Sequence, residues 1–149
     1  MSKCFFIAFS TLLSATCFAG AWGVGSFEND SALDWSYELK HSKSSVVLLS
    51  AFNSVQGSGY IEVDACSAAM AAADIVASIK ANSFGKLPDD VKKWAISNSL
   101  IINEALVSSA KKAVASCVDE SNSELAQLWR ESSNKEWEAY VSELNSRLK

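Results

Sequence analysis

Carboxylate side chains at helical spacing are the residues of this chain best suited to chemistry. Asp30 and Asp34 are four residues apart, so they would share one face of a helix that has begun by Asp30. A second series follows spacings of three and four along one stripe of an Ala-rich segment: Asp64, Ser67, Ala71, Asp74 and Ser78. Carboxylates in a helix bundle can hold a metal ion, but the known pattern takes a Glu-x-x-His from each of two helices. With one histidine in the chain that pattern cannot form, and we expect no metal site.

The simpler interpretation of these carboxylates is structural. A carboxylate on an otherwise apolar helix must be paired or hydrogen-bonded. We therefore expect Asp30 and Asp74 to be helix caps or partners of an Arg, a Lys, a Trp N–H or a backbone amide.

Other residues and motifs suited to catalysis are scarce. His41 lies beside Lys40 at the expected end of a helix, where a solvated position is the ordinary expectation. The chain has no nucleophile elbow, phosphate loop, dinucleotide fingerprint or metal-protease helix. We expect no cofactor and favour a protein without enzymatic activity. The alternative is a small carboxylate- or metal-dependent hydrolase that uses Asp30, Asp34 and Asp74.

Residues 1–19 have the three parts of a secretory signal peptide. The apolar run Cys4–Leu13 is about half the roughly 20 residues that a spanning helix needs. Small residues at Cys17 and Ala19 predict cleavage after Ala19, although an uncleaved anchor and a lipoprotein acylated at Cys17 are alternatives. We expect a periplasmic or secreted protein, with one helical domain over residues 20–149 and no stable membrane insertion after cleavage.

Two cysteines, Cys66 and Cys117, remain in the exported chain. An oxidising compartment favours one disulfide between them. Such a bond would close a loop of roughly 50 residues, worth ~4 kcal/mol in the chain-entropy model. The alternative is two buried free thiols.

The charge of the chain limits its partners. The formal net charge is −4, and removal of Lys3 with the signal makes the exported chain more acidic. Nucleic acid and anionic membranes both require clustered Lys and Arg, so we expect neither as a main partner. An acidic surface suits a basic protein partner.

The composition predicts an all-α fold. The chain has one proline and six glycines, and its Ala-rich run at 61–81 predicts a central helix. We expect six or seven helices in one compact domain, preceded by an irregular Gly/Trp segment. The other helices are expected from about Asp30 to Lys40, from Ser44 or Ser45 to before Gly57, after Pro88, from about Leu100 to Cys117, and after two capping boxes, Ser121–Glu124 and Ser133–Glu136.

The five tryptophans are expected to be mainly core residues. Trp129 and Trp137, on the last two expected helices, are the pair that we expect to be partly exposed at an interface.

The segment GAWGVGSFENDSALDW at residues 20–35 carries a resemblance that extends over the exported chain. It resembles the opening of a bacterial family known only as domain of unknown function 4259, whose members typically begin Gly-Ala-Trp-Gly, then Phe-(Asp/Glu)-Asn-Asp, then Ala-x-Asp-Trp. The export signal and the cysteine pair are departures from that family. The family has no established activity, but the resemblance implies a local structural unit or binding site made of Trp22, Phe27, Asn29, Asp30, Asp34 and Trp35; Asp74 lies in a further matching stretch.

Together these observations favour an exported protein that acts by binding another protein. A concrete form is an immunity-type inhibitor whose acidic face captures a basic periplasmic toxin or enzyme. Another alternative is an envelope ligand-binding protein with a pocket lined by Trp22 and Trp35. The sequence does not decide the oligomeric state.

Overall fold

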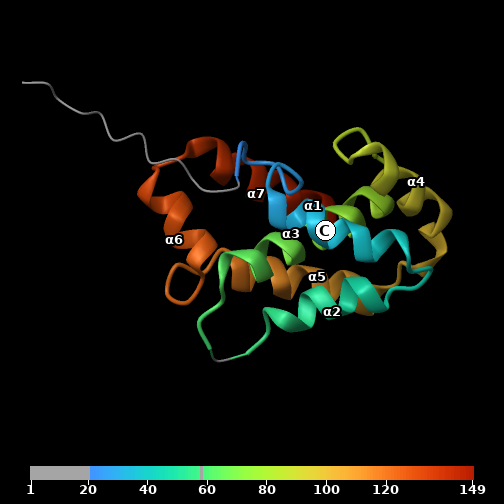
Figure 1. Cartoon of the computed structure of the whole chain (residues 1–149), viewed down its shortest axis with the longest axis horizontal. Helices are drawn as coiled ribbons and strands as arrows, with labels where there is room; N and C mark the ends of the chain where they lie inside the picture. Colours follow the sequence, from blue (N-terminus) through green and yellow to red (C-terminus); the bar gives the residue numbers. More distant parts are fainter. Residues whose placement is uncertain (1–20, 58) are drawn as a thin grey trace, which may run out of the picture.

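The computed structural model describes residues 21–57 and 59–149, and the predicted signal peptide lies outside the described residues (Figure 1). The described chain forms seven α-helices and one 3₁₀ helix, which confirms the expected all-α class. Their bounds are α1 (Asp30–Lys40), α2 (Val46–Ser54), α3 (Val63–Lys80), α4 (Asp89–Ser97), η1 (Ser99–Ile101), α5 (Glu104–Cys117), α6 (Glu124–Glu131) and α7 (Lys135–Leu148).

Helix α3 is the centre of the fold, as its alanine content predicted. Every residue from Ala69 to Ile79 is buried, and α1, α2, α5 and α7 all pack against α3 (Figure 1). Alanine supports the helix and is small enough to let the neighbouring helices approach closely. Burial on nearly every side agrees with the mostly apolar sequence of this helix, and its polar residues Asp74 and Ser78 are buried as well.

A disulfide joins Cys66 of α3 to Cys117 at the end of α5, with Cα atoms 5.4 Å apart. The two cysteines that the sequence singled out are therefore placed as a disulfide requires. Beside it, the hydroxyl of Ser123 donates to the carbonyl oxygen of Cys117 at 2.9 Å. Ile61 forms a parallel bridge with Ser123, in which Glu124 N donates to Ile61 O at 3.0 Å. These bonds hold the start of α6 against the start of α3.

The start of α5 differs from the prediction. The helix begins at Glu104 rather than near Leu100, because Asn103 is its cap and accepts a hydrogen bond from Leu106 N at 2.9 Å. Leu100 belongs to η1 and is 99% exposed, and Ile102 has extended backbone. An asparagine at this position satisfies a free amide of the first turn, and it therefore decides where the helix begins.

Neither predicted capping box forms. Ser123 caps α6 and accepts from Ala126 N, whereas Asn134 caps α7 and accepts from Glu136 N at 2.9 Å and Trp137 N at 3.3 Å. The carboxylate of Glu124, expected to bond within its own helix start, accepts instead from Val63 N at 2.8 Å. A tertiary contact between α6 and α3 thus replaces the local one.

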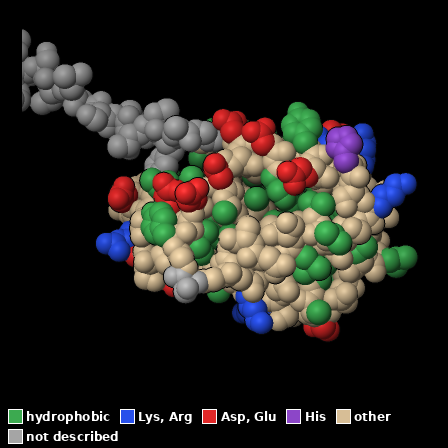
Figure 2. Space-filling model, turned by 60° about the horizontal axis from the view of Figure 1, so that its bottom comes forward, with side chains coloured by type: hydrophobic (Ala, Val, Ile, Leu, Met, Phe, Trp, Pro, Cys, Tyr) green, Lys and Arg blue, Asp and Glu red, His purple; other side chains and the backbone are tan. Residues whose placement is uncertain are grey.

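Charge is unevenly distributed over the surface. On the face drawn in Figure 2, Asp and Glu side chains gather on the upper part, and most Lys and Arg side chains lie toward the edges. No helix in the described part of the chain is both long and apolar enough to cross a bilayer.

Candidate functional site

The loop that precedes α1 is folded around one carboxylate. Trp22 N donates to Glu28 O at 3.0 Å, and Gly25 N donates to Glu28 Oε2 at 2.8 Å. A Cβ atom at Gly23 would overlap the Glu28 carboxylate, and one at Gly25 would lie 2.9 Å from Oε2. The glycines of the opening motif therefore make room for Glu28.

The end of the same loop is anchored to the core and to α1. Phe27 is 8% exposed and belongs to the hydrophobic core. Asn29 is the α1 cap: its Oδ1 accepts from Ala32 N at 2.8 Å, and its Nδ2 donates to Ser26 O at 3.2 Å. Phe27 and Asn29, two of the six residues that the resemblance singles out, thus fix the end of the loop to the core and to α1.

Asp74 fastens the loop to the middle of the molecule. Its Oδ2 accepts from Ser26 Oγ at 2.6 Å and from Tyr140 Oη at 3.3 Å. Its Oδ1 accepts from Arg147 Nη1 at 2.8 Å, which makes an ion pair with side chains only 3% and 14% exposed. Burial, followed by the neighbouring Asp74 carboxylate, raises the pKa of Tyr140 far above its ordinary 10.0. Asp74 has one of the partners expected for it, an arginine.

The other predicted site residues lie apart from this network. Asp30 and Asp34 are exposed on α1, and Trp35 is half-buried against the core. Trp22 is 60% exposed, so it is not the core residue expected of it. Among the described residues, no cluster of three or more His, Cys, Asp or Glu side chains could hold a metal ion. Of the three carboxylates of the hydrolase hypothesis, Asp30 and Asp34 are thus exposed on α1, whereas Asp74 is buried and paired with Arg147.

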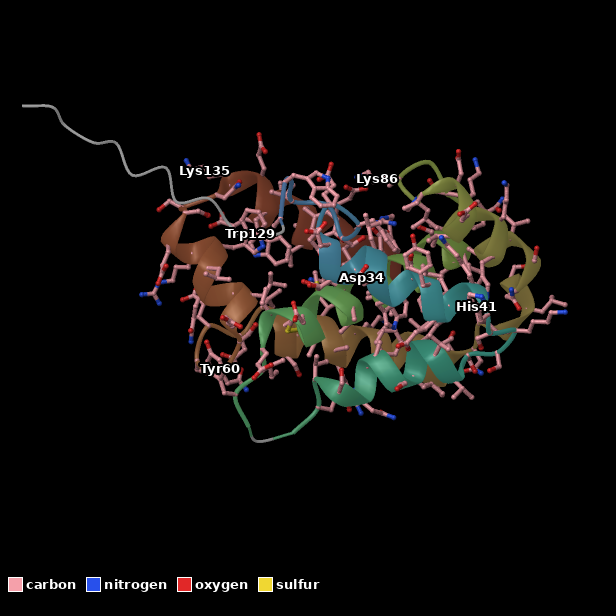
Figure 3. All side chains as sticks on the ribbon, in the orientation of Figure 1. Asp34, His41, Tyr60, Lys86, Trp129 and Lys135 are labelled. Carbon is pink, nitrogen blue, oxygen red and sulfur yellow. A yellow bond between two sulfur atoms is a disulfide. The ribbon has the colours of Figure 1, made fainter. Side chains whose placement is uncertain are left out.

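A cleft of about 470 Å³ opens between the loop before α1, the start of α3, and helix α6. Its apolar surface includes the side chains of Met70, Leu125 and Leu128 together with Trp129 and Trp137. Figure 3 shows Trp129 between α6 and the loop before α1, toward which it points. Clefts of 300–1,000 Å³ with mostly apolar lining are typical of small-ligand sites.

Two tryptophans form one wall of the cleft. The rings of Trp129 and Trp137 stack with centroids 5.3 Å apart and an interplanar angle of 14°. The ring of Tyr140 extends the stack, 5.7 Å from that of Trp137. The corner between α6 and α7 brings the two tryptophans together: Ser133 has a positive φ of 50°, and the Asn134 cap then starts α7. Trp129 is 8% exposed and Trp137 half-buried.

Polar groups lie around the rim of the cleft. Ser31 Oγ donates to Asp64 Oδ1 at 2.5 Å, which links the start of α1 to the start of α3. Glu124 and Glu131 of α6 also line the opening. The described lining contains these three carboxylates but no Lys, Arg, His or Cys.

The cleft differs from the predicted site in all but one residue. Of the residues singled out from the sequence as a binding site, only Asn29 lines it, and neither Trp22 nor Trp35 does. Trp129 and Trp137 were expected to be a partly exposed pair, and Trp137 fits that description. What the sequence did not reveal is that they face the opening loop.

Fold and site together define an all-helical protein with an apolar, acid-rimmed cleft. Residues 20–140 match the family model described as Domain of unknown function (DUF4259), and the chain belongs to that family. Comparison with curated proteins and with solved structures finds no match.

Proposed function

We propose that this is an exported, non-enzymatic binding protein and that the cleft beside α6 is its binding site. The observation that carries the proposal is the stacked wall of Trp129 and Trp137, which presents aromatic surface to an open cavity of about 470 Å³. Aromatic side chains that remain accessible beside an apolar cavity are typical of ligand sites, because a bound molecule can bury them further.

The chemistry of the lining favours binding over catalysis. The described lining offers seryl hydroxyls and carboxylates but no imidazole or thiol, the groups that most often activate a nucleophile or act as one at neutral pH. Two of the predicted site carboxylates, Asp30 and Asp34, lie outside the lining, and Asp74 is occupied by its arginine.

The proposal is tested with phenylnaphthylamine, an uncharged probe that fluoresces strongly in apolar sites. We expect saturable binding at one site per chain. Trp137→Ala should weaken it by about tenfold, since it removes one ring of the wall. Trp35→Ala is the matched control, because Trp35 is also half-buried but does not line the cleft.

Circular dichroism and thermal melting would establish that both variants fold. If Trp137→Ala does not fold, Leu128→Asn replaces it, because Leu128 lines the cleft and is only partly buried. Failure of the probe to bind the wild-type protein would reject the proposal. Equal weakening by the Trp35 control would also reject the cleft as the site.

A second candidate function is capture of a basic protein, in the manner of an immunity-type inhibitor. The acidic net charge and the carboxylates gathered on one part of the surface support it (Figure 2). Affinity capture from the protein's own periplasmic and secreted fractions should then yield a stoichiometric basic partner. The complex should weaken in high salt and in Asp30→Asn/Asp34→Asn, which neutralises an exposed pair on α1. If the partner is captured equally well in high salt and by the double variant, this second candidate function is rejected.

A further inference from the structure

We infer that the cleft binds a small organic cation, namely an amine or guanidinium attached to an aromatic or branched apolar body. This inference rests on the proposed function, because it names the class of ligand for the same cleft. Two features carry it together: an aromatic wall that suits an apolar body, and a rim whose ionisable side chains are all acidic.

The acidic side chains at the rim of the cleft have no basic side chain beside them in the described lining. Asp64, Glu124 and Glu131 line the cleft, and the described lining includes no Lys or Arg. The one basic residue of α6, Arg130, does not line the cleft and is paired with Glu120 at 2.7 Å. An arriving cation would therefore meet carboxylates that no side chain of the lining neutralises.

The amino ends of three helices oppose this conclusion, because such ends attract anions. Helices α1, α3 and α6 all begin at the cleft. One first-turn amide of each helix is engaged by the protein itself, however: Asn29 accepts from Ala32 N, and Glu124 accepts from Val63 N. Ser123 in turn accepts from Ala126 N. The protein's own caps thus offset part of the partial positive charge at these helix starts, whereas the carboxylates carry full charges.

The bonds made by the rim carboxylates leave their charge in place. Ser31 Oγ occupies Oδ1 of Asp64, and Val63 N occupies Oε2 of Glu124. Both donors are neutral, so they orient the carboxylates without cancelling their charge. Each bond engages only one of the two oxygens, and the second remains available to an ammonium or guanidinium group.

The tryptophan wall suits the apolar body of the same class of ligand. Trp137 is half-buried, and a ligand that packs against it removes more aromatic surface from water. A ligand with its apolar body against Trp137 and its charge near the rim would use both features. The size of the cleft, about 470 Å³, accommodates a bicyclic aromatic body with a short aminoalkyl arm.

Three probes of one shape separate the charge from the apolar body: naphthylmethylamine, naphthylmethanol and naphthylacetate. At neutral pH they are a cation, a neutral molecule and an anion. Titration calorimetry on the folded protein should rank the amine first and the acetate last, with about a tenfold difference between those two. The advantage of the amine over the alcohol should shrink as salt is added.

Asp64→Asn is the matching variant. It should weaken amine binding several-fold and leave the alcohol unchanged, because it removes a charge and preserves the size of the side chain. Asp89→Asn is the control, since Asp89 is also an exposed aspartate in a first helical turn but lies outside the cleft. It should leave the affinity for all three probes unchanged.

The results separate failure of this inference from failure of the proposed function. Equal binding of amine and alcohol, or tightest binding of the acetate, would overturn the cation preference and leave the cleft as a binding site. Equal weakening of all three probes by Asp64→Asn would also overturn it, because the residue would then act through structure. If neither these probes nor phenylnaphthylamine binds, the proposed function fails together with the inference.

Discussion

Replacing the buried Asp74 by asparagine is expected to cost the fold about 3 kcal/mol. Removal of one partner from a buried ion pair typically costs 3–5 kcal/mol, because the remaining charge has lost its compensation. Here the guanidinium of Arg147 would be left with one further carboxylate, Glu143, at 3.6 Å from its Nε. Its Nη2 is buried without a hydrogen-bond partner. Glu143 is 44% exposed and offers partial compensation, so the lower end of the range applies.

Asp74→Asn removes the negative charge but keeps the size of the side chain and an acceptor oxygen. Ser26 and Tyr140 both donate to Oδ2 of Asp74, and an amide oxygen can accept the same bonds. The complementary variant, Arg147→Met, should cost a similar amount, because it leaves a carboxylate buried beside neutral donors only. In the double variant neither charge is left unpaired. It should therefore be more stable than the sum of the two losses predicts, by about 2 kcal/mol.

Urea unfolding followed by circular dichroism measures all three variants. The total stability of a domain of this size is about 5–15 kcal/mol, so each variant should still fold. The urea concentration at the unfolding midpoint should fall, while the slope of the free energy of unfolding against urea concentration stays constant. A loss below about 1 kcal/mol in Asp74→Asn, or additivity of the two substitutions within about 0.5 kcal/mol, would refute the argument that this ion pair is buried and coupled.

Three further predictions concern the loop, the buried tyrosine and the disulfide. Gly23→Ala should cost about 1 kcal/mol, because its Cβ displaces Glu28 from its bond to the loop amide, whereas Gly85→Ala, whose Cβ meets open space, should cost almost nothing by urea unfolding. Tyr140 has a pKa raised by burial, so its stabilisation is complete below its ordinary pKa of 10.0 and is lost as the pH rises above that value. Tyr140→Phe should remove this alkaline loss of stability in urea midpoints measured across pH. Serine in place of both half-cystines should cost about 4 kcal/mol, measured the same way without reductant.

Each of these predictions has an outcome that contradicts it. Equal stability of Gly23→Ala and Gly85→Ala would mean that the loop does not depend on the Glu28 carboxylate. An unchanged alkaline profile in Tyr140→Phe would mean that other groups cause the loss. A disulfide-free protein as stable as the wild type would show that the bond constrains the unfolded chain very little.

The helices were predictable because their signals are local. The alanine run of α3 predicts a helix by composition, and burial of every residue from Ala69 to Ile79 then follows from its central position. The helix starts were less predictable. Ser121 and Ser123 are both possible caps for α6, and the pattern that favoured Ser121 assigned Glu124 to a local bond. In the structure Glu124 bonds to Val63 across the fold, a choice made by tertiary contacts.

The cleft could not be predicted, because its walls come from segments far apart in the chain. Trp129 and Trp137 both lie on apolar faces of short helices, and helical spacing alone does not show that they line the same cavity. Their opening toward solvent depends on the turn at Ser133 and on the position of the loop before α1. The sequence suggested a pocket lined by Trp22 and Trp35 of the opening motif, but neither residue lines the cleft.

The opening motif and the cleft nevertheless belong together, because the motif builds one wall of the cleft. Glu28 folds the loop, and the Ser26–Asp74 bond ties the loop to α3. The motif glycines therefore act on binding indirectly, through the position of this wall. Gly23→Ala should weaken the cation, the alcohol and the anion probes to the same degree, whereas Asp64→Asn should affect the cation alone. That contrast separates the residues that shape the cleft from the residues that choose its ligand.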